Sequence, residues 1–289
     1  MMGFFNAMFQ AVVQGLTEFL PVSSSGHLQL VQHFTAQGVE NIYIFSVIVH
    51  LGTFFAIIIA FRERVWALCK EFCSAVVDIF TLKFSFKNMN GNRRMLVMMV
   101  ISLAMLLPAY PFKHLFEQQA HFIMLGICFM VTSVLLFVSD KIATGRKTAE
   151  DINYKNALTI GIMQAVAIMP GISRSGSTTS AGLICGFNRN LAVEYAFILG
   201  LPTIFVGAVF ELKDFFAEGA AIPVEGGMLT LILAFFIAMI VGVFAIKMVS
   251  ILLNKNKFKI FAWYTGILGI VVLVIGIIEI FKKAPLFQI

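Results

Sequence analysis

Residues 14–27, Gln-Gly-Leu-Thr-Glu-Phe-Leu-Pro-Val-Ser-Ser-Ser-Gly-His, interrupt the first apolar stretch of the chain, and a similar break follows at 170–178, Pro-Gly-Ile-Ser-Arg-Ser-Gly-Ser-Thr. The first break separates Phe4–Leu20 from Leu28–Phe34, and the second separates Ala157–Met169 from Ala181–Phe187. A helix over Ala157–Met169 would be only about 20 Å long, which is too short to cross the hydrocarbon layer of a membrane. The sequence therefore predicts two re-entrant hairpins, each a pair of half-helices that enters and leaves on one side. Two kinked full spans are the alternative.

The composition is that of an integral membrane protein. Of the 289 residues, 60% are hydrophobic and only 12% are charged, whereas a soluble domain carries about 25% charged residues. These proportions exclude a soluble enzyme, a disordered chain and a secreted disulfide scaffold. The four cysteines are predicted to be free thiols. The net charge of +6 comes from basic residues in short loops, which indicates orientation in a membrane rather than nucleic-acid binding.

Six apolar segments are long enough to be membrane spans, and an internal repeat relates the two halves. The spans are Ile42–Phe61, Met95–Phe112, Phe122–Ser139, Leu191–Phe210, Met228–Leu253 and Ile260–Phe281. A shift of 150 residues places Gln14 on Gln164, Ser23 on Ser173, Ser25 on Ser175, Gly26 on Gly176 and Thr53 on Thr203. We therefore expect an all-α membrane domain of two repeats, 1–145 and 146–289, each with one hairpin and three spans. An odd number of spans per repeat makes the topology inverted.

Lysine and arginine predict the orientation in the membrane. Fifteen of the 21 basic residues lie in the loops 62–94, 140–156, 188–190 and 254–259, and four lie in the loops of the other side. The positive-inside rule places the first set in the cytoplasm. Both termini should then be extracytoplasmic, with the first hairpin entering from outside and the second from the cytoplasm. Loop 62–94 is predicted to hold an amphipathic interfacial helix around Val65–Phe80.

The polar residues of the two breaks point to an anion-binding site with additional acid–base groups. Serines at a helix start present free backbone N–H groups and the positive end of the helix dipole, and Arg174 adds a cation suited to phosphate. Glu18 would repel phosphate, so its presence indicates a divalent cation or a base. His27 lies one helical turn from Ser23 and Ser24 and could transfer a proton. Such a set suits phosphoryl transfer.

Each of these residues also has a purely structural interpretation. Glu18 and Arg174 could form a buried ion pair, and His27 could bond a backbone carbonyl within the core. The serines could be ordinary helix caps. His50, in the first full span, and Glu194, at the start of the fourth, could equally support neighbouring groups or take part in chemistry.

The motifs at 14–27 and 170–178, with Val49-His50-Leu51-Gly52-Thr53, resemble those of the bacterial undecaprenyl pyrophosphate phosphatases, the bacitracin-resistance family. The resemblance extends over essentially the whole chain. It implies removal of the terminal phosphate from undecaprenyl diphosphate, which recycles the lipid carrier for peptidoglycan synthesis. The expected location is the bacterial plasma membrane, with the active site open to the extracytoplasmic side.

Carried over by position, the resemblance implies catalytic roles for Glu18, Ser24, His27 and Arg174. Ser173 and Thr178 would hold the phosphates with Arg174, and the hydroxyls and amide of Ser23, Ser25, Ser175 and Gln14 complete the expected substrate-binding set. The family is associated with Mg²⁺ or Ca²⁺, for which Glu18 is the expected ligand. Where the family motif can begin with Glu this chain has Gln14, so a metal held by two carboxylates of this helix is in doubt.

The competing interpretation is a transporter or polyprenyl-phosphate flippase without hydrolytic activity, because inverted repeats with broken helices are a transporter architecture. The expected partners are a polyprenyl diphosphate lipid and the bilayer, with no nucleic acid. The sequence does not determine the oligomeric state, and a homodimer is compatible with it. Nor does it decide between Ser24 and an activated water as the nucleophile.

Overall fold

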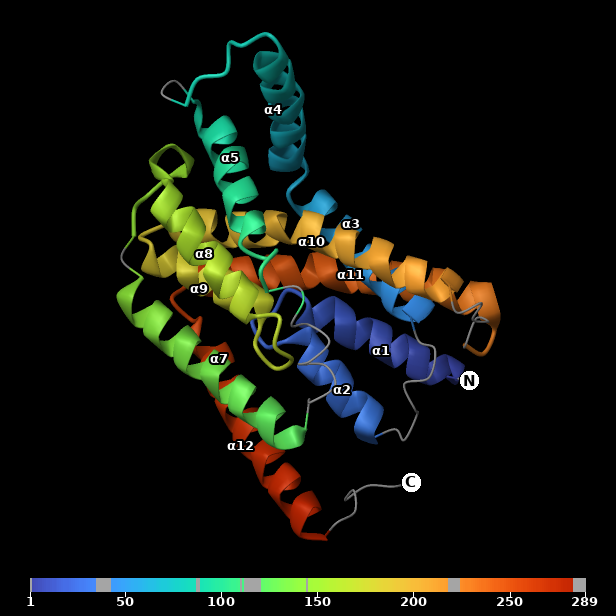
Figure 1. Ribbon diagram of the computed structural model, residues 1–289. Helices are drawn as coiled ribbons and strands as arrows, with labels where there is room; N and C mark the ends of the chain where they lie inside the picture. The colour runs from blue at the N-terminus through green and yellow to red at the C-terminus, as the bar shows by residue number, and fades with distance from the viewer. Residues whose placement is uncertain are drawn as a thin grey trace.

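The computed structural model is built of helices (Figure 1) and describes residues 2–34, 43–86, 89–109, 111, 121–143, 145–217 and 224–282. The helices in the first half are α1 (Phe4–Thr17), α2 (Ser24–Phe34), α3 (Tyr43–Ala60), α4 (Arg62–Phe80), α5 (Gly91–Ala104) and α7 (Phe122–Ile142). Those in the second half are α8 (Tyr154–Val166), α9 (Arg174–Ile184), α10 (Arg189–Ala217), α11 (Gly227–Asn254) and α12 (Lys259–Lys282), with a short 3₁₀ turn at Ala149–Asp151. The predicted all-α class is confirmed for the described residues.

Four described helices, α7, α10, α11 and α12, are long and apolar enough to cross a membrane. They coincide with four of the six predicted spans. The pair α3 and α4 would add a fifth span, but the two helices meet at an angle of 91°. The sequence predicts an interfacial helix around Val65–Phe80, and the helix found there is α4, which begins three residues earlier, at Arg62.

The helix α5 differs from the predicted span Met95–Phe112. Asn90 caps its start by accepting a hydrogen bond from the backbone N–H of Arg93, at 2.8 Å, so the helix begins before the apolar run. It ends at Ala104 because Pro108 has no N–H to donate to the carbonyl of Ala104. The chain instead closes tighter turns, in which the N–H of Leu107 bonds the Ala104 carbonyl at 3.2 Å. The predicted span extended past Ala104 because it was based on a count of apolar residues, which did not include the effect of this proline. Phe112, the last residue of the predicted span, lies outside the described residues.

Both predicted breaks are present, and they lie back to back near the middle of the molecule (Figure 1). The first, between α1 and α2, contains Pro21, and the second, between α8 and α9, contains Pro170 and Gly171. Each break contains one residue with a left-handed backbone: Ser23 has φ = 70° and Gly171 has φ = 92°. For glycine this conformation carries no steric cost, whereas serine adopts it only against a preference of roughly 1–2 kcal/mol.

The broken helices are held between the long ones. The helix α1 packs on α11, α8 packs on α5, and α9 packs on both α7 and α10. The longest contact joins α7 to α12, where Gly126 and Gly269 allow the two backbones to approach closely: a Cβ on Gly126 would lie 2.8 Å from the Gly269 carbonyl oxygen. Small residues at such crossings are typical of helices that associate within a membrane.

The α3–α11 contact gives a stability prediction at Gly52. A Cβ there would lie 2.5 Å from the carbonyl oxygen of Phe235 and 3.0 Å from Cβ of Ala238, so the helices would have to separate. We expect Gly52→Ala to destabilise the protein by about 1–3 kcal/mol, seen as a lower melting temperature in detergent. Gly207→Ala is the matched control, because no atom lies within 4 Å of its added Cβ. An equal loss in both variants would contradict the close-packing explanation.

The loops group at two opposite ends of the long helices. At one end, Arg189 donates to Asp140 at 3.1 Å and to the Leu253 carbonyl at 3.0 Å, which joins the ends of α7, α10 and α11. At the other, the Phe4 N–H donates to Glu225 at 3.2 Å, so the start of α1 lies beside the start of α11. The first end, called the basic end from here on, contains described residues of the loops 140–156, 188–190 and 254–259 and, through the Arg64–Glu194 ion pair, the start of α4.

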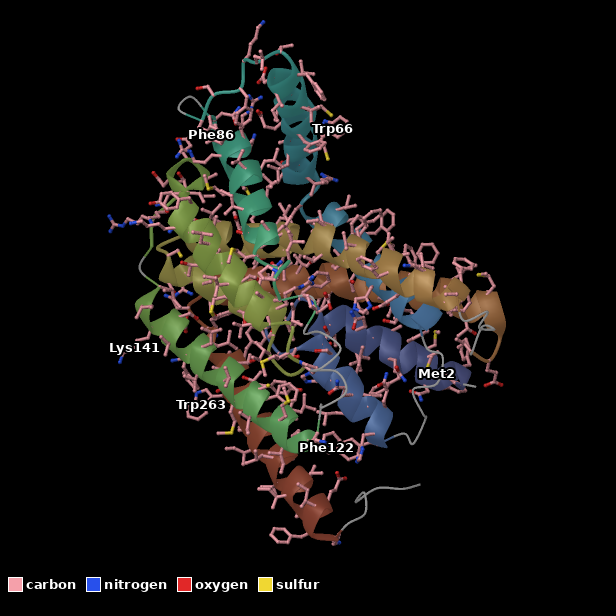
Figure 2. The ribbon with its side chains drawn as sticks, in the orientation of Figure 1. Met2, Trp66, Phe86, Phe122, Lys141 and Trp263 are labelled. Atoms are coloured by element: carbon pink, nitrogen blue, oxygen red, sulfur yellow. The ribbon has the colours of Figure 1, made fainter. Side chains whose placement is uncertain are left out.

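Both tryptophans lie towards the basic end of the molecule. Trp66 is near the start of α4 and Trp263 near the start of α12; they are 63% and 61% exposed, and both project from the helix surface (Figure 2). Tryptophan is enriched at membrane–water interfaces. The pattern is the one expected where these helix ends meet the membrane surface.

The cysteines are free thiols, as predicted. Cys69 and Cys73 are exposed on α4, Cys128 is buried in α7, and Cys185 is half-buried at the end of α9.

Candidate active site

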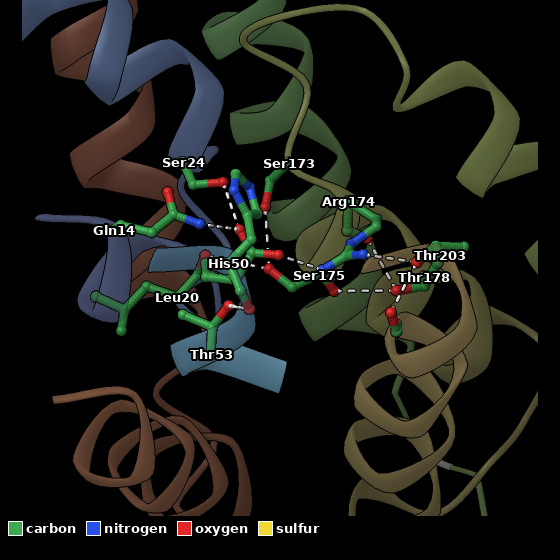
Figure 3. Close-up of polar contacts among 12 residues, drawn as sticks. Gln14, Leu20, Ser24, His50, Thr53, Ser173, Arg174, Ser175, Thr178 and Thr203 are labelled. Carbon is green, nitrogen blue, oxygen red and sulfur yellow. Dashed lines mark hydrogen bonds and ion pairs between the residues drawn. The ribbon is translucent and has the colours of Figure 1, made fainter. Parts of the chain in front are cut away.

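Glu18 is the centre of the polar network between the two breaks, and Figure 3 labels its partners Gln14, Ser24 and Arg174. It follows the last residue of α1, and its backbone N–H still donates to the Gln14 carbonyl at 3.0 Å, which fixes it at the helix end. Its Oε2 accepts hydrogen bonds from the Gln14 amide at 2.9 Å and from the Ser24 hydroxyl at 2.8 Å. The carboxylate is buried, so these donors and the cation described next replace water around it.

Arg174 reaches Glu18 from the opposite break. It is the first residue of α9, and its Nη2 donates to Glu18 Oε1 while its Nη1 donates to the Thr203 hydroxyl on α10 at 2.7 Å. The Thr203 hydroxyl in turn donates to the Gly200 carbonyl at 2.9 Å, so the threonine accepts from the guanidinium in a fixed orientation. The ion pair foreseen as the structural interpretation of Glu18 is thus formed. It places a cation, a carboxylate and a hydroxyl together.

The two helix starts repeat one hydrogen-bond pattern. Ser23 Oγ accepts from the Gly26 N–H at 3.4 Å, and Ser173 Oγ accepts from the Gly176 N–H at 3.1 Å. In each break the first serine also contacts the serine two positions on, at 3.3 Å for Ser25 and 3.2 Å for Ser175. Ser23 and Ser173 therefore act as helix-start caps, as the structural interpretation proposed.

Ser24 and Ser175 are used differently from the capping serines. The Ser24 hydroxyl donates to the buried carboxylate of Glu18, which makes it the hydroxyl closest to a base. The Ser175 hydroxyl donates to the carbonyl of Leu20 at 3.1 Å and so ties α9 directly to the first break.

The two breaks enclose a cavity of about 50 Å³, large enough for a few water molecules. It is lined by seven of the predicted site residues, Glu18, Ser23, Ser24, Ser25, Ser173, Arg174 and Ser175, together with Thr17, Ala167 and Ile172. Gln14 lies behind Glu18, as its hydrogen bond shows. Thr178 is buried, and its hydroxyl donates to the Arg174 carbonyl at 2.8 Å, so it stabilises the first turn of α9 instead of lining the cavity.

His27 is placed outside this cavity. Its Nδ1 lies 2.8 Å from the Ser23 carbonyl oxygen, which can only accept, so Nδ1 carries the proton. In the neutral imidazole Nε2 is then an acceptor, and it bonds the hydroxyl of Tyr264 on α12 at 2.7 Å. The two rings are stacked at 5.7 Å. The predicted acid–base role of His27 would therefore require the imidazole to leave Tyr264.

Sequence reasoning did not assign three of the supporting residues. Thr203 was identified only through its register with Thr53, and Tyr264 lies in an apolar span with no signal that marks it. His50 was left undecided, and its Nδ1 donates to the Ser46 carbonyl at 2.8 Å. Figure 3 shows His50 grouped with Gln14 and Ser24.

The side chains between the breaks supply only part of the ligand set of a divalent cation. The described residues contain no group of three His, Cys, Asp or Glu side chains arranged around one point. Glu18 is the one carboxylate among the described residues that line the cavity. The Oε1 atom of Gln14 beside it is buried and has no hydrogen-bond donor among the described residues. One carboxylate and one amide oxygen suit an ion such as Mg²⁺ that takes its other ligands from phosphates and water.

Comparisons with known proteins support the family suggested by the motifs. Residues 7–271 match the family described as Bacitracin resistance protein BacA. A protein of Alkaliphilus metalliredigens named undecaprenyl-diphosphatase is 34% identical over 275 residues, covering 95% of this chain and 99% of that protein. Proteins of the same name from Carboxydothermus hydrogenoformans and Halothermothrix orenii are 36% and 35% identical; they match 95% of this chain and 98% and 99% of their own lengths.

Proposed function

Because the chain belongs to the bacitracin resistance protein family, we propose that it hydrolyses undecaprenyl diphosphate to undecaprenyl phosphate and phosphate. The apolar helices and the family make it a multi-pass membrane protein. The observation that carries the proposal is the Arg174–Glu18–Ser24 array at a cavity between two helix starts. An arginine fork and free helix N–H groups bind phosphate oxygens, while a hydroxyl bonded to a carboxylate provides a nucleophile with its base.

In the proposed reaction Arg174 and the N–H groups at the start of α9 hold the terminal phosphoryl group and stabilise its developing charge. Ser24 Oγ attacks the phosphorus, its proton passes to Glu18 Oε2, and undecaprenyl phosphate leaves. Water then hydrolyses the phosphoserine, which restores Ser24 and releases phosphate. The geometry supports Glu18 as the base for this serine, because it accepts the Ser24 hydroxyl bond at 2.8 Å while His27 bonds Tyr264.

Substrate binding requires a change at Arg174, because its guanidinium is already bonded to Glu18. The proposed first step is therefore an exchange in which a phosphate oxygen replaces the Glu18 carboxylate on the guanidinium. A divalent cation held by Glu18 and Gln14 would supply charge neutralisation on the phosphates. The polyprenyl tail would remain between helices in the bilayer.

We further propose the finer architecture expected from the sequence: six spans and two re-entrant hairpins, arranged as inverted repeats over 1–145 and 146–289. Its support is the shared hydrogen-bond pattern of the two breaks and the equivalent packing of α1 on α11 and α8 on α5. Thr53 and Thr203 also match, since each hydroxyl donates to the carbonyl three residues earlier, at 2.8 and 2.9 Å.

The proposed orientation places the basic end of the helices in the cytoplasm, the termini outside, and the site opening on the extracytoplasmic side. Native cysteines allow a direct test, because Cys69 and Cys73 are exposed on α4 at the basic end. A membrane-impermeant maleimide is expected to label them in inside-out vesicles and not in intact cells. The Cys69→Ser/Cys73→Ser variant should lose the labelling. If intact cells are labelled and this variant abolishes the labelling, the orientation is opposite to the one proposed.

The proposed function is tested by measuring phosphate release from undecaprenyl diphosphate with purified protein in detergent, with and without EDTA. We expect phosphate release, a loss of at least about tenfold with EDTA, and recovery with Mg²⁺ or Ca²⁺. A flippase without hydrolytic activity, the second candidate favoured by the broken helices, would release no phosphate. Full activity in EDTA would remove the cation from the proposal and leave the hydrolysis intact.

A further inference from the structure

A second cavity, here called the bend groove, lies where α3 turns into α4. Its volume is about 520 Å³, far larger than the 50 Å³ cavity between the breaks, and the two share no lining residue. One wall is apolar and comes from the end of α3 and from α11, including Ile59 and Val243. The other wall is charged. The groove is therefore amphipathic, with room for a group larger than a few water molecules.

Two basic side chains in the bend groove have no partner among the described residues. Arg64 is neutralised, since it donates to both carboxylate oxygens of Glu194, at 2.7 and 3.2 Å, and to Asn92 at 2.7 Å. Arg62 and Lys247 also line the groove and are exposed, and within the described part of the chain neither makes a hydrogen bond or ion pair. The remaining acid, Glu63, offsets one of these charges. The groove thus keeps an excess positive charge.

The bend groove lies at the boundary between apolar and polar surface. Lys247 is seven residues, about 10 Å, before the last residue of α11, and Trp66 lies one turn beyond Arg62. On the α11 face that leads to Lys247, Phe244 and Ile240 are each 64% exposed, three and seven residues earlier. A single lysine near a helix end is explained by snorkelling. Snorkelling does not explain a cavity that is lined by two basic side chains and lies beside the exposed apolar residues Phe244 and Ile240.

We propose that the bend groove binds the phosphate headgroup of an anionic membrane lipid, with Arg62 and Lys247 on the phosphate and the acyl chain along Phe244 and Ile240. Basic pockets between membrane helices bind anionic headgroups in this manner. Inorganic phosphate is also an anion that the two basic side chains could bind, but it has no acyl chain to contact Phe244 and Ile240. The inference is independent of the hydrolytic reaction proposed above.

The test is native mass spectrometry of the full-length protein in detergent with added phosphatidylglycerol, phosphatidylcholine or inorganic phosphate. We expect bound phosphatidylglycerol in preference to the other two. The variant Arg62→Gln/Lys247→Gln should bind it about 25-fold more weakly, from about fivefold for each basic residue at a membrane surface. Glu63→Gln should bind it more tightly, because it removes the one unpaired acid of the groove.

Lys83→Gln/Lys155→Gln is the matched control, since both lysines are exposed at the same end of the molecule and neither lines the groove. Its binding should equal that of the unmodified protein. Equal loss in the two double variants would show a general charge effect and overturn the proposal, as would unchanged binding in Arg62→Gln/Lys247→Gln. Equal binding of inorganic phosphate and phosphatidylglycerol would overturn the lipid assignment. Melting temperatures without added lipid confirm that each variant is folded.

Discussion

Replacement of Arg174 by alanine is expected to lower the rate of phosphate release from undecaprenyl diphosphate by at least about a thousandfold. Among the described residues that line the cavity between the breaks, Arg174 is the one basic side chain, and its two terminal nitrogens are held by Glu18 and Thr203. Without it, negative charge on the transferring phosphoryl group would be stabilised only by helix N–H groups and hydroxyls. The assay is initial-rate phosphate release by purified protein.

Loss of Arg174 also leaves the Glu18 carboxylate buried without its cation, which typically destabilises a protein by about 3–5 kcal/mol. Two further variants separate chemistry from folding. Arg174→Lys retains the charge but replaces the planar fork, whose two nitrogens hold Glu18 and Thr203, by a single nitrogen, so we expect an intermediate loss of about 10- to 100-fold. Glu18→Gln/Arg174→Gln replaces the ion pair by neutral partners and should recover stability without recovering turnover. Turnover near the unmodified rate in a folded Arg174→Ala protein would show that the arginine serves structure alone.

Glu18→Gln is expected to reduce turnover by about 10²- to 10⁴-fold, the range for removing a general base. Glutamine has nearly the same shape, but its one amide oxygen can accept on the side of Ser24 or on the side of Arg174 and not on both, so the melting temperature is expected to fall. Glutamine also cannot take a proton from the Ser24 hydroxyl, which the carboxylate accepts at 2.8 Å. The measurement is kcat with saturating substrate, together with the melting temperature.

Glu194→Gln is the matched control for Glu18→Gln. Glu194 is also a carboxylate of the helical core paired with an arginine, Arg64, but it lies at the bend groove and not at the cavity between the breaks. We expect its kcat to stay within about threefold of the unmodified value, the size of effect expected for a residue that touches no reacting atom. If Glu18→Gln retains a comparable kcat, Glu18 is only the partner of Arg174, and the base must be sought elsewhere.

The sequence was sufficient to locate the breaks and most of the cavity lining, because both depend on local signals. Pro21, Pro170 and the serine clusters indicate where helices end and begin again. Ser23 and Ser173, which the 150-residue register aligns, each accept the same hydrogen bond at a helix start. Hydrophobicity likewise identified α7, α10, α11 and α12, whose lengths suffice for a span. These features are determined by residues close together in the chain and not by tertiary contacts.

Other features depend on contacts between distant elements, which single-sequence reasoning does not supply. His27 is close to Ser23 and Ser24 in the chain, yet the hydroxyl of Tyr264, 237 residues later, is the partner of its Nε2. The 91° angle between α3 and α4 leaves no mark in composition, although it creates the bend groove. The early end of α5 could have been predicted from Pro108. The span was predicted from the number of apolar residues alone, which does not include the effect of a proline.

The Glu18–Arg174 pair also bears on how products leave. Glu18 behaves as a built-in competitor for the guanidinium, so any phosphate that binds must displace an anion already held beside it. A free phosphate ion, which lacks the anchorage of a lipid tail, gains little from that exchange. Once the anhydride bond is cut, the carboxylate can reclaim Arg174 and expel the phosphate, which would make the enzyme resistant to inhibition by its own inorganic product.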